Sequence, residues 1–216
     1  MRPSVTIVDY GSGNVFSVAS ALKHSGASVK LASDPDAICK AERLVLPGVG
    51  AFGAAMTVLE ERGLVAGILA FVSTGRPFLG ICVGQQALMD VGEEFGRHYG
   101  MGLIQGTVSP IKPTAADGTI HPVPHTGWSA LIPSERGWVG SMFEGLKPET
   151  PVYFVHSFAA VPDSRKHVLA TCDYDGNEIV AAIIKDNLTG CQFHPEKSGP
   201  VGLVILKNFC GLTQGE

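Results

Sequence analysis

Short apolar runs alternate with helix-like segments through the first half of the chain. The apolar runs are rich in β-branched residues, which is typical of buried strands. After the first run, Val15, Val18 and Leu22 recur at helical spacing, and Gly26 is placed to end that helix. The pattern predicts strands at 5–9, 28–32, 43–46 and 78–81 and a helical stretch over 52–72, broken around Gly63.

The second half of the chain has a different pattern. Residues 107–128 are rich in Pro, Gly and Thr and suggest hairpins and loops. Asp175-Gly176-Asn177 and Asp186-Asn187 are typical hairpin turns between apolar runs. The predicted strands here are 152–155, 168–171, 179–184 and 190–193, and a closing helix covers 201–209.

Strands that alternate with helices imply right-handed crossovers and a mainly parallel sheet. We therefore predict an α/β fold in which a mixed, mainly parallel sheet carries helices on both faces. The sequence has no internal repeat, low-complexity tract or linker that would divide it, so residues 1–216 are expected to form one domain.

Charge and hydropathy exclude two classes of function. The net charge is −4 and Lys and Arg form no block, so nucleic-acid binding is not expected. The longest apolar run, residues 64–72, is too short to span a bilayer. The first four residues lead straight into an apolar strand, so no signal peptide is expected.

The cysteines also narrow the possibilities. There are five, at 39, 82, 172, 191 and 210, with no Cys-x-x-Cys pair. This set suits neither a disulfide framework nor a zinc site, and reduced thiols in the cytoplasm are the simplest interpretation. The cysteine set leads us to expect no metal, and since no phosphate-binding or dinucleotide motif occurs we expect no cofactor.

The most informative segment is Pro77 to Gln86, in which Cys82 stands between Gly80 and Gly84. An apolar run enters it and a helix-compatible run, 85–89, follows. Small residues on both sides of Cys82 permit the sharp strand-to-helix turn of a nucleophile elbow. A thiol at a helix N-terminus favours the thiolate. The alternative is a buried structural cysteine at a strand end.

A second motif near the C-terminus supplies partners for a nucleophilic thiol. His194 and Glu196 are two residues apart, and on an extended chain such residues point to the same face. A carboxylate beside an imidazole fixes its tautomer and stabilises the imidazolium. Alone, His194 would more often be a surface or capping histidine and Glu196 a solvated charge, but with the elbow they suggest a Cys-His-Glu triad.

At these residues the chain resembles the class I glutamine amidotransferases. Their elbow motif is matched at Gly80, Ile81, Cys82, Gly84 and Gln86, and their Phe-His-Pro-Glu motif at 193–196. Five segments, in order, further resemble the glutaminase subunits of imidazole glycerol phosphate synthases, which belong to histidine biosynthesis. These segments are 9–14, 46–52, 124–128, 153–157 and 194–198. Small departures occur at Gln85, Thr126 and Ser129, outside the triad.

The resemblance implies hydrolysis of L-glutamine to glutamate and ammonia. Cys82 would attack the amide, His194 would transfer protons and Glu196 would orient His194. The remaining site residues implied are the oxyanion donors and pocket residues Val49, Gly50, Val83, Gly84, Gln86, Ser157 and Phe158. Taken alone, Gly48 and Gly50 could form a plain strand-to-helix turn, and Gln86 could be an exposed helical residue.

The chain shows no second site at which ammonia could be used, so an acceptor protein is implied. The resemblance makes that partner an imidazole glycerol phosphate cyclase in a heterodimer, with full activity only in the complex. Asn14, Trp128 and Lys197 are expected on the docking surface. As a loop Trp and a Lys after a strand, the last two could instead be a partial core plug and a solvated charge.

Two other interpretations remain. The chain could be the glutaminase subunit of another ammonia-using synthase, for pyridoxal phosphate or anthranilate. It could also be a non-catalytic regulatory subunit that keeps the fold, although the presence of Cys82, His194 and Glu196 argues against that.

Overall fold

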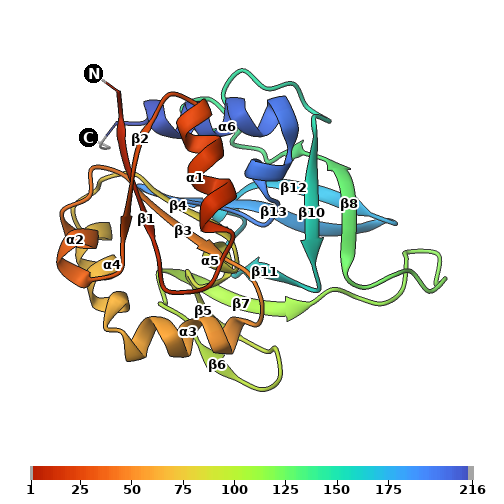
Figure 1. The fold of residues 1–216 in the computed structure, drawn as a ribbon. Helices are drawn as coiled ribbons and strands as arrows, with labels where there is room; N and C mark the ends of the chain where they lie inside the picture. Colours follow the sequence, from red (N-terminus) through yellow and green to blue (C-terminus); the bar gives the residue numbers. More distant parts are fainter. Residues whose placement is uncertain (1, 214–216) are drawn as a thin grey trace.

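A computed structural model describes residues 2–213, and within it eight strands form the central sheet (Figure 1). They are β1 (Ser4–Val8), β2 (Ser28–Ala32), β3 (Leu44–Gly48), β4 (Phe78–Cys82), β9 (Ile132–Pro133), β12 (Val168–Tyr174), β13 (Asn177–Lys185) and β14 (Leu188–Cys191). The spatial order is β2-β1-β3-β4-β14-β13-β12-β9. The strands from β2 to β14 pair in parallel and the others pair antiparallel, so the predicted mixed, mainly parallel sheet is confirmed.

Helices cover both faces of this sheet, as predicted. They are α1 (Val15–His24), α2 (Pro35–Cys39), α3 (Phe52–Glu61), α4 (Leu64–Val72), α5 (Val83–Gln86) and α6 (Gly199–Gly211). From β1 the chain first moves outward to β2 and then returns past β1 to β3 and β4. Right-handed crossovers therefore place α1 on one face and α2, α3 and α4 on the other. Helix α6 packs beside α1 (Figure 1). None of the helices described is long and apolar enough to cross a membrane.

The predicted elements of the first half agree with the structure. Gly63, at φ 67°, separates α3 from α4, and Gly26, at φ 95°, lies just beyond α1. Asn14 begins α1, where its side-chain oxygen accepts a hydrogen bond of 3.3 Å from the backbone N–H of Ser17. This is the usual capping role of Asn. Helix α2 was not predicted.

The second half contains more strands than the sequence pattern indicated. Two smaller sheets, ordered β11-β7-β5-β6 and β10-β8, are built from β5 (Met89–Gly92), β6 (His98–Tyr99), β7 (Ile104–Pro110), β8 (His125–Ala130), β10 (Pro151–His156) and β11 (Phe158–Pro162). Two short 3-10 helices are η1 (Arg165–His167) and η2 (Pro195–Lys197). The prediction of hairpins and loops over 107–128 was wrong at both ends, because β7 and β8 pair with strands far along the chain. Trp128 consequently lies in β8 and not in a loop.

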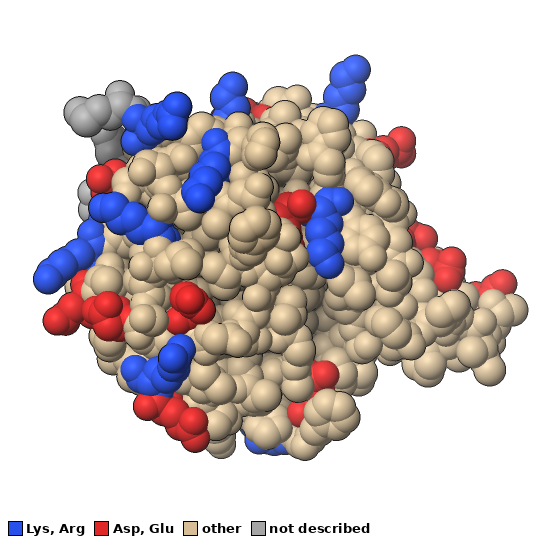
Figure 2. All heavy atoms as spheres, in the orientation of Figure 1, with Lys and Arg blue, Asp and Glu red and all other residues tan. Residues whose placement is uncertain are grey.

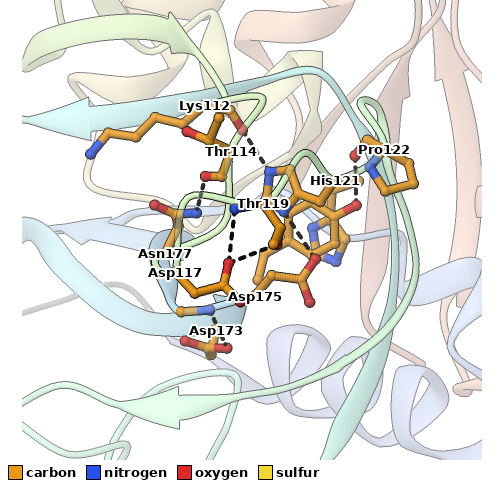
Figure 3. Close-up of polar contacts among 12 residues, drawn as sticks. Lys112, Thr114, Asp117, Thr119, His121, Pro122, Asp173, Asp175 and Asn177 are labelled. Carbon is orange, nitrogen blue, oxygen red and sulfur yellow. Dashed lines mark hydrogen bonds and ion pairs between the residues drawn. The ribbon is translucent and has the colours of Figure 1, made fainter.

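Between β7 and β8 the chain forms an arm, residues 111–124, that projects from the body (Figure 1). His121 holds the arm against the β12–β13 turn (Figure 3): its Nδ1 lies 2.9 Å from Asp175 Oδ2 and its Nε2 2.6 Å from the carbonyl of Lys112. Both neighbours only accept hydrogen bonds, so both ring nitrogens carry protons. The hydrogen bond to Lys112 and the one to Asp175 raise the pKa of His121 accordingly. The arm ends at Pro124, which borders the cavity described below.

Candidate active site

Cys82 occupies a strained turn at the end of β4. All five residues of β4 are buried, and Cys82 has φ 55° and ψ −112°, which non-glycine residues rarely adopt. The chain enters α5 at the next residue, so the predicted strand, sharp turn and helix are present. The helix is shorter than predicted: α5 has four residues, and Met89 already begins β5. One turn adds little macrodipole, so other groups must stabilise a thiolate.

The glycines around Cys82 are required by close backbone contacts. A Cβ on Gly84 would overlap the carbonyl oxygen of Leu46 in β3, and one on Gly80 would overlap the carbonyl of Gly84. A Cβ on Gly48, at the end of β3, would lie 2.7 Å from that of Val83. The elbow is thus packed directly onto the neighbouring strand. Gly84, expected in the pocket, does not line it and lies behind Cys82 as a packing position.

We expect Gly84→Ala to destabilise the fold, because the obstructing atom belongs to the backbone and cannot move aside. Overpacking of this kind costs about 3 kcal/mol, which corresponds to a melting temperature lowered by roughly 6 to 12 °C. Gly211→Ala is the matched control, since a Cβ there meets open space at the end of α6. Thermal unfolding of the two variants checks this, and equal stability would contradict the packing argument.

His194 and Glu196 form a buried pair beside the elbow. The distance from His194 Nδ1 to Glu196 Oε1 is 2.8 Å, and the two side chains are 3% and 1% exposed. Burial lowers the pKa of His194, but hydrogen bonding to Cys82 and Glu196 outweighs burial and raises it to about 9. The extended geometry assumed from the sequence was wrong after His194, since residues 195–197 form η2. Pro195 starts this turn and brings Glu196 back to the imidazole.

Ser198 ties this motif to β10. Its hydroxyl donates to the carbonyl of His194 at 2.7 Å and accepts from the backbone N–H of Tyr153 at 3.0 Å. The N–H of His194 in turn donates to the carbonyl of Tyr153 at 2.9 Å. The backbone that carries the imidazole is therefore held on both sides.

A cavity of about 430 Å³ opens over Cys82 and His194, within the usual range of roughly 300 to 1,000 Å³ for small-molecule pockets. Its lining residues are Val49, Gly50, Ala51, Cys82, Val83, Gln86, Glu94, Phe95, Pro124, Val155, His156, Ser157, Phe158, His194 and Lys197. The structure thus brings the predicted oxyanion and substrate residues around one cavity, except Gly84. Lys197 was expected only on the docking surface but also lines the cavity.

Gln86 is buried, so its interpretation as an exposed helical residue was wrong. It is 3% exposed, and its Nε2 donates to the carbonyl of Phe158 and to Gln192 Oε1, each at 3.0 Å. Only its oxygen can therefore face a ligand. The carbonyl of Ser157 accepts from the N–H of Ile111 at 2.9 Å. With both carbonyls engaged, the N–H groups are the backbone donors that Ser157 and Phe158 can offer a substrate.

Two polar residues of the cavity were missed. Glu94 places a carboxylate at the cavity, where its Oε2 accepts from the N–H of Phe52 at 2.7 Å at the start of α3. His156 donates to the carbonyl of Phe158 at 2.9 Å, and burial lowers its pKa to about 3, so it is neutral. Glu94 belongs to a loop without periodic pattern, and nothing local signalled its position. His156 belongs to 153–157, one of the five segments that resemble glutaminase subunits.

The three expected docking residues lie in different settings. Trp128 is 57% exposed, and its ring meets that of Tyr153 edge-on with centroids 6.0 Å apart. Lys197 Nζ lies 5.9 Å from the centroid of the same ring. Asn14 is partly buried in its capping contact. On the face that shows β10 and the start of α1, most Lys, Arg, Asp and Glu side chains lie toward the edge, and a few lie near the middle (Figure 2).

The fold and the cavity define a class of protein that comparison with known families identifies. Residues 6–211 match the family described as Glutamine amidotransferase class-I. The chain therefore belongs to the class I glutamine amidotransferases. Solved structures of PurLQS and of a glutamine amidotransferase, both from Thermotoga maritima, share the fold, with TM-scores of 0.73 and 0.59. They are 19% and 16% identical in sequence, cover 98% and 91% of this chain, and are themselves covered to 99% and 77%.

Whole-length relatives are more specific. The chain is 47% identical over 208 residues to imidazole glycerol phosphate synthase subunit HisH 1 of Legionella pneumophila (strain Lens), covering 95% of this chain and 98% of the relative. It is 45% identical over 206 residues to subunit HisH of Syntrophotalea carbinolica, with the same coverage. Within the family, the chain groups with these HisH subunits.

Proposed function

We propose that the protein is the glutaminase subunit of an imidazole glycerol phosphate synthase and that Cys82, His194 and Glu196 are its catalytic triad. The observation that carries this proposal is the buried His194–Glu196 pair, which hydrogen-bonds toward a cysteine held in a strained elbow at the floor of a cavity. The HisH relatives support the pathway.

The reaction follows from this geometry. Cys82, whose proton has already passed to His194, attacks the carboxamide carbon of glutamine as the thiolate. The C–N bond then breaks as His194 protonates the departing ammonia, leaving a thioester on Cys82. Water, deprotonated by His194, attacks the thioester carbonyl and releases glutamate. Backbone N–H groups of Val83 and of the Val49–Gly50 segment are the proposed donors to the oxyanion.

We infer that substrate recognition uses polar groups of the cavity that can still form hydrogen bonds. We infer that Glu94, together with the Gln86 oxygen, receives the α-ammonium of glutamine. The N–H groups of Ser157 and Phe158 are the proposed donors to its α-carboxylate. Gln86 thus supplies an acceptor only, which restricts the role expected from the sequence.

We expect Glu94→Gln to raise the KM for glutamine by about 10- to 100-fold with a smaller change in kcat, because it removes a charged hydrogen bond to bound substrate. The amide oxygen of the variant can still accept from the N–H of Phe52, so the start of α3 is preserved. Steady-state kinetics checks this, with thermal unfolding as the control for folding. An unchanged KM would show that Glu94 does not contact the substrate.

The ammonia is proposed to pass to a cyclase partner that makes imidazole glycerol phosphate, in a heterodimer. Support comes from the HisH relatives and from the exposed ring of Trp128. We place the protein in the cytoplasm, because its five cysteines are all unpaired.

The test is glutamine hydrolysis by the purified chain, alone and with an imidazole glycerol phosphate cyclase plus its nucleotide ligand. We expect low hydrolysis alone and strong stimulation by the loaded cyclase. Equal rates would point to a stand-alone glutaminase, and stimulation only by a different synthase would assign the chain to another pathway.

Two variants distinguish residues needed for association with the cyclase from residues needed for glutamine hydrolysis. Trp128→Ala should weaken association with the cyclase by about 30-fold or more, as for a truncated aromatic hot spot. Gly50→Ala should leave association unchanged but reduce hydrolysis, because Gly50 has φ 87° and a side chain there strains the backbone that presents the proposed oxyanion donor. Losing such a donor costs about 100- to 1,000-fold. Titration calorimetry and turnover in the saturated complex measure the two effects, and weakened association of Gly50→Ala would contradict the separation.

A further inference from the structure

A second side chain contacts the sulfur of Cys82 besides His194. Gln192 follows β14, is 0% exposed, and its Nε2 lies 3.5 Å from Cys82 Sγ. Its Oε1 accepts from Gln86 Nε2 at 3.0 Å. The backbone N–H of Gln192 donates to the carbonyl of Ala181 at 2.8 Å, which fixes the residue on β13.

The direction of this chain of hydrogen bonds is set at its far end. The carbonyl of Phe158 can only accept, so the group of Gln86 that faces it at 3.0 Å must be the NH₂. That same NH₂ faces Gln192, which must therefore present its oxygen to Gln86. The NH₂ of Gln192 then points at Cys82. The direction of these hydrogen bonds cannot be reversed without burying an unpaired polar group.

We propose that Gln192 is a further catalytic residue, whose amide donates a hydrogen bond to the Cys82 thiolate, and that Gln86 is the positioning residue that fixes the orientation of this amide. The inference rests on the role of Cys82 as the nucleophile. A neutral thiol is a weak acceptor and a thiolate a strong one, so a buried N–H aimed at sulfur favours the ionised form.

The other groups near Cys82 do not provide this contact. Burial raises the pKa of Tyr10 to about 12 and that of Cys191 well above its ordinary value, so neither brings a charge near the sulfur. Among residues 2–213, neither of them hydrogen-bonds to Cys82, whereas Gln192 does. His194, oriented by Glu196, is the proton carrier and changes charge during the reaction. Glu94 and Lys197 lie on the cavity lining. Gln192 does not titrate, so its donor is present both when the thiolate attacks and when it leaves the thioester.

The test is the pH dependence of Cys82 alkylation by iodoacetamide in the full-length protein without glutamine, followed by mass spectrometry. A hydrogen bond to a charged acceptor corresponds to about a 10- to 100-fold change in an ionisation equilibrium. Gln192→Met should therefore raise the midpoint of alkylation by about one to two pH units. Gln192→Glu, which has the same shape but carries an acceptor-only carboxylate, should raise it further. Gln86→Met should give a smaller rise and be non-additive with Gln192→Met.

Gln85→Met is the matched control. Gln85 is also 0% exposed, neighbours Gln86 in α5, and neither of its amide atoms has a hydrogen-bond partner among residues 2–213. Its replacement should leave the midpoint unchanged. A variant-free measurement is the side-chain amide resonance of Gln192, which should shift with the same midpoint as alkylation.

The outcomes are distinct. An unshifted midpoint in both Gln192 variants, or an amide resonance that ignores the titration, overturns the role of Gln192 while leaving Cys82 as the nucleophile. If Cys82 of the parent protein shows no preferential alkylation, the proposed function fails first. An equal shift in Gln85→Met would show that any buried methionine disturbs the elbow, and would also overturn the inference.

Discussion

Cys82→Ala should abolish glutamine-dependent synthesis by the complex with its cyclase and leave synthesis from free ammonia intact. The loss should be on the order of 10⁴-fold or more, because the variant can form no covalent intermediate. Cys82→Ser should behave alike, since its hydroxyl is a much weaker nucleophile in a site built for a thiol. Ammonia-dependent synthesis survives because the acceptor chemistry belongs to the partner.

A glutamine-analogue electrophile should label Cys82 and spare the other four cysteines. Burial raises the pKa of Cys172 to about 12, that of Cys210 to about 11, and that of Cys191 well above its ordinary value, so these thiols stay protonated and unreactive. Cys39 is the partly exposed competitor, and Cys39→Ala is therefore the control background. A label found on Cys191 would refute the assignment.

The first half of the fold was predictable because its elements are local. The buried strands are continuous apolar runs, and Gly26 and Gly63 interrupt helical patterns where the structure needs positive φ. Strand β7 contains Gly106 and polar residues and is stabilised by pairing with β11, a strand far along the chain that places Ala160 opposite Val108. No local pattern reports such pairing, so the peripheral sheets could not be derived from periodicity.

The residues of the site also divide into those that a local segment predicts and those that depend on distant contacts. The elbow and the His-x-Glu motif are each a short continuous segment, and the sequence alone predicted their catalytic roles. Gln192 lies two residues before His194, yet its proposed role depends on contacts with Gln86 and Cys82, which are 106 and 110 positions away in the chain. Glu94 reaches the cavity from a loop. The roles proposed for Gln192 and Glu94 depend on the assembled sheets and not on any one segment.

His194→Ala should cost about as much as Cys82→Ala, because it removes both the base for the thiol and the acid for ammonia. We expect a loss of about 10⁴-fold, at the upper end for acid–base residues. Glu196→Gln should cost less, about 100-fold, since the imidazole can still align part of the time. Single-turnover hydrolysis in the saturated complex measures both, and a folded His194→Ala variant with near-normal turnover would disprove the triad.

The pH dependence distinguishes orientation from mere packing by Glu196. The pKa of His194 is raised to about 9, so the imidazolium and its stabilising contacts persist at neutral pH and are lost as the pH rises through about 9. Its contribution to stability is fully present below the unfolded value near 6.5 and disappears over the same rise. Glu196→Gln removes the charge that holds this proton, so the alkaline limb of hydrolysis should move to lower pH. The stability difference from the parent protein should be largest below about pH 6.5 and vanish above 9. If the alkaline limb of hydrolysis stays in place in Glu196→Gln and the loss of stability does not depend on pH, Glu196 has a packing role alone.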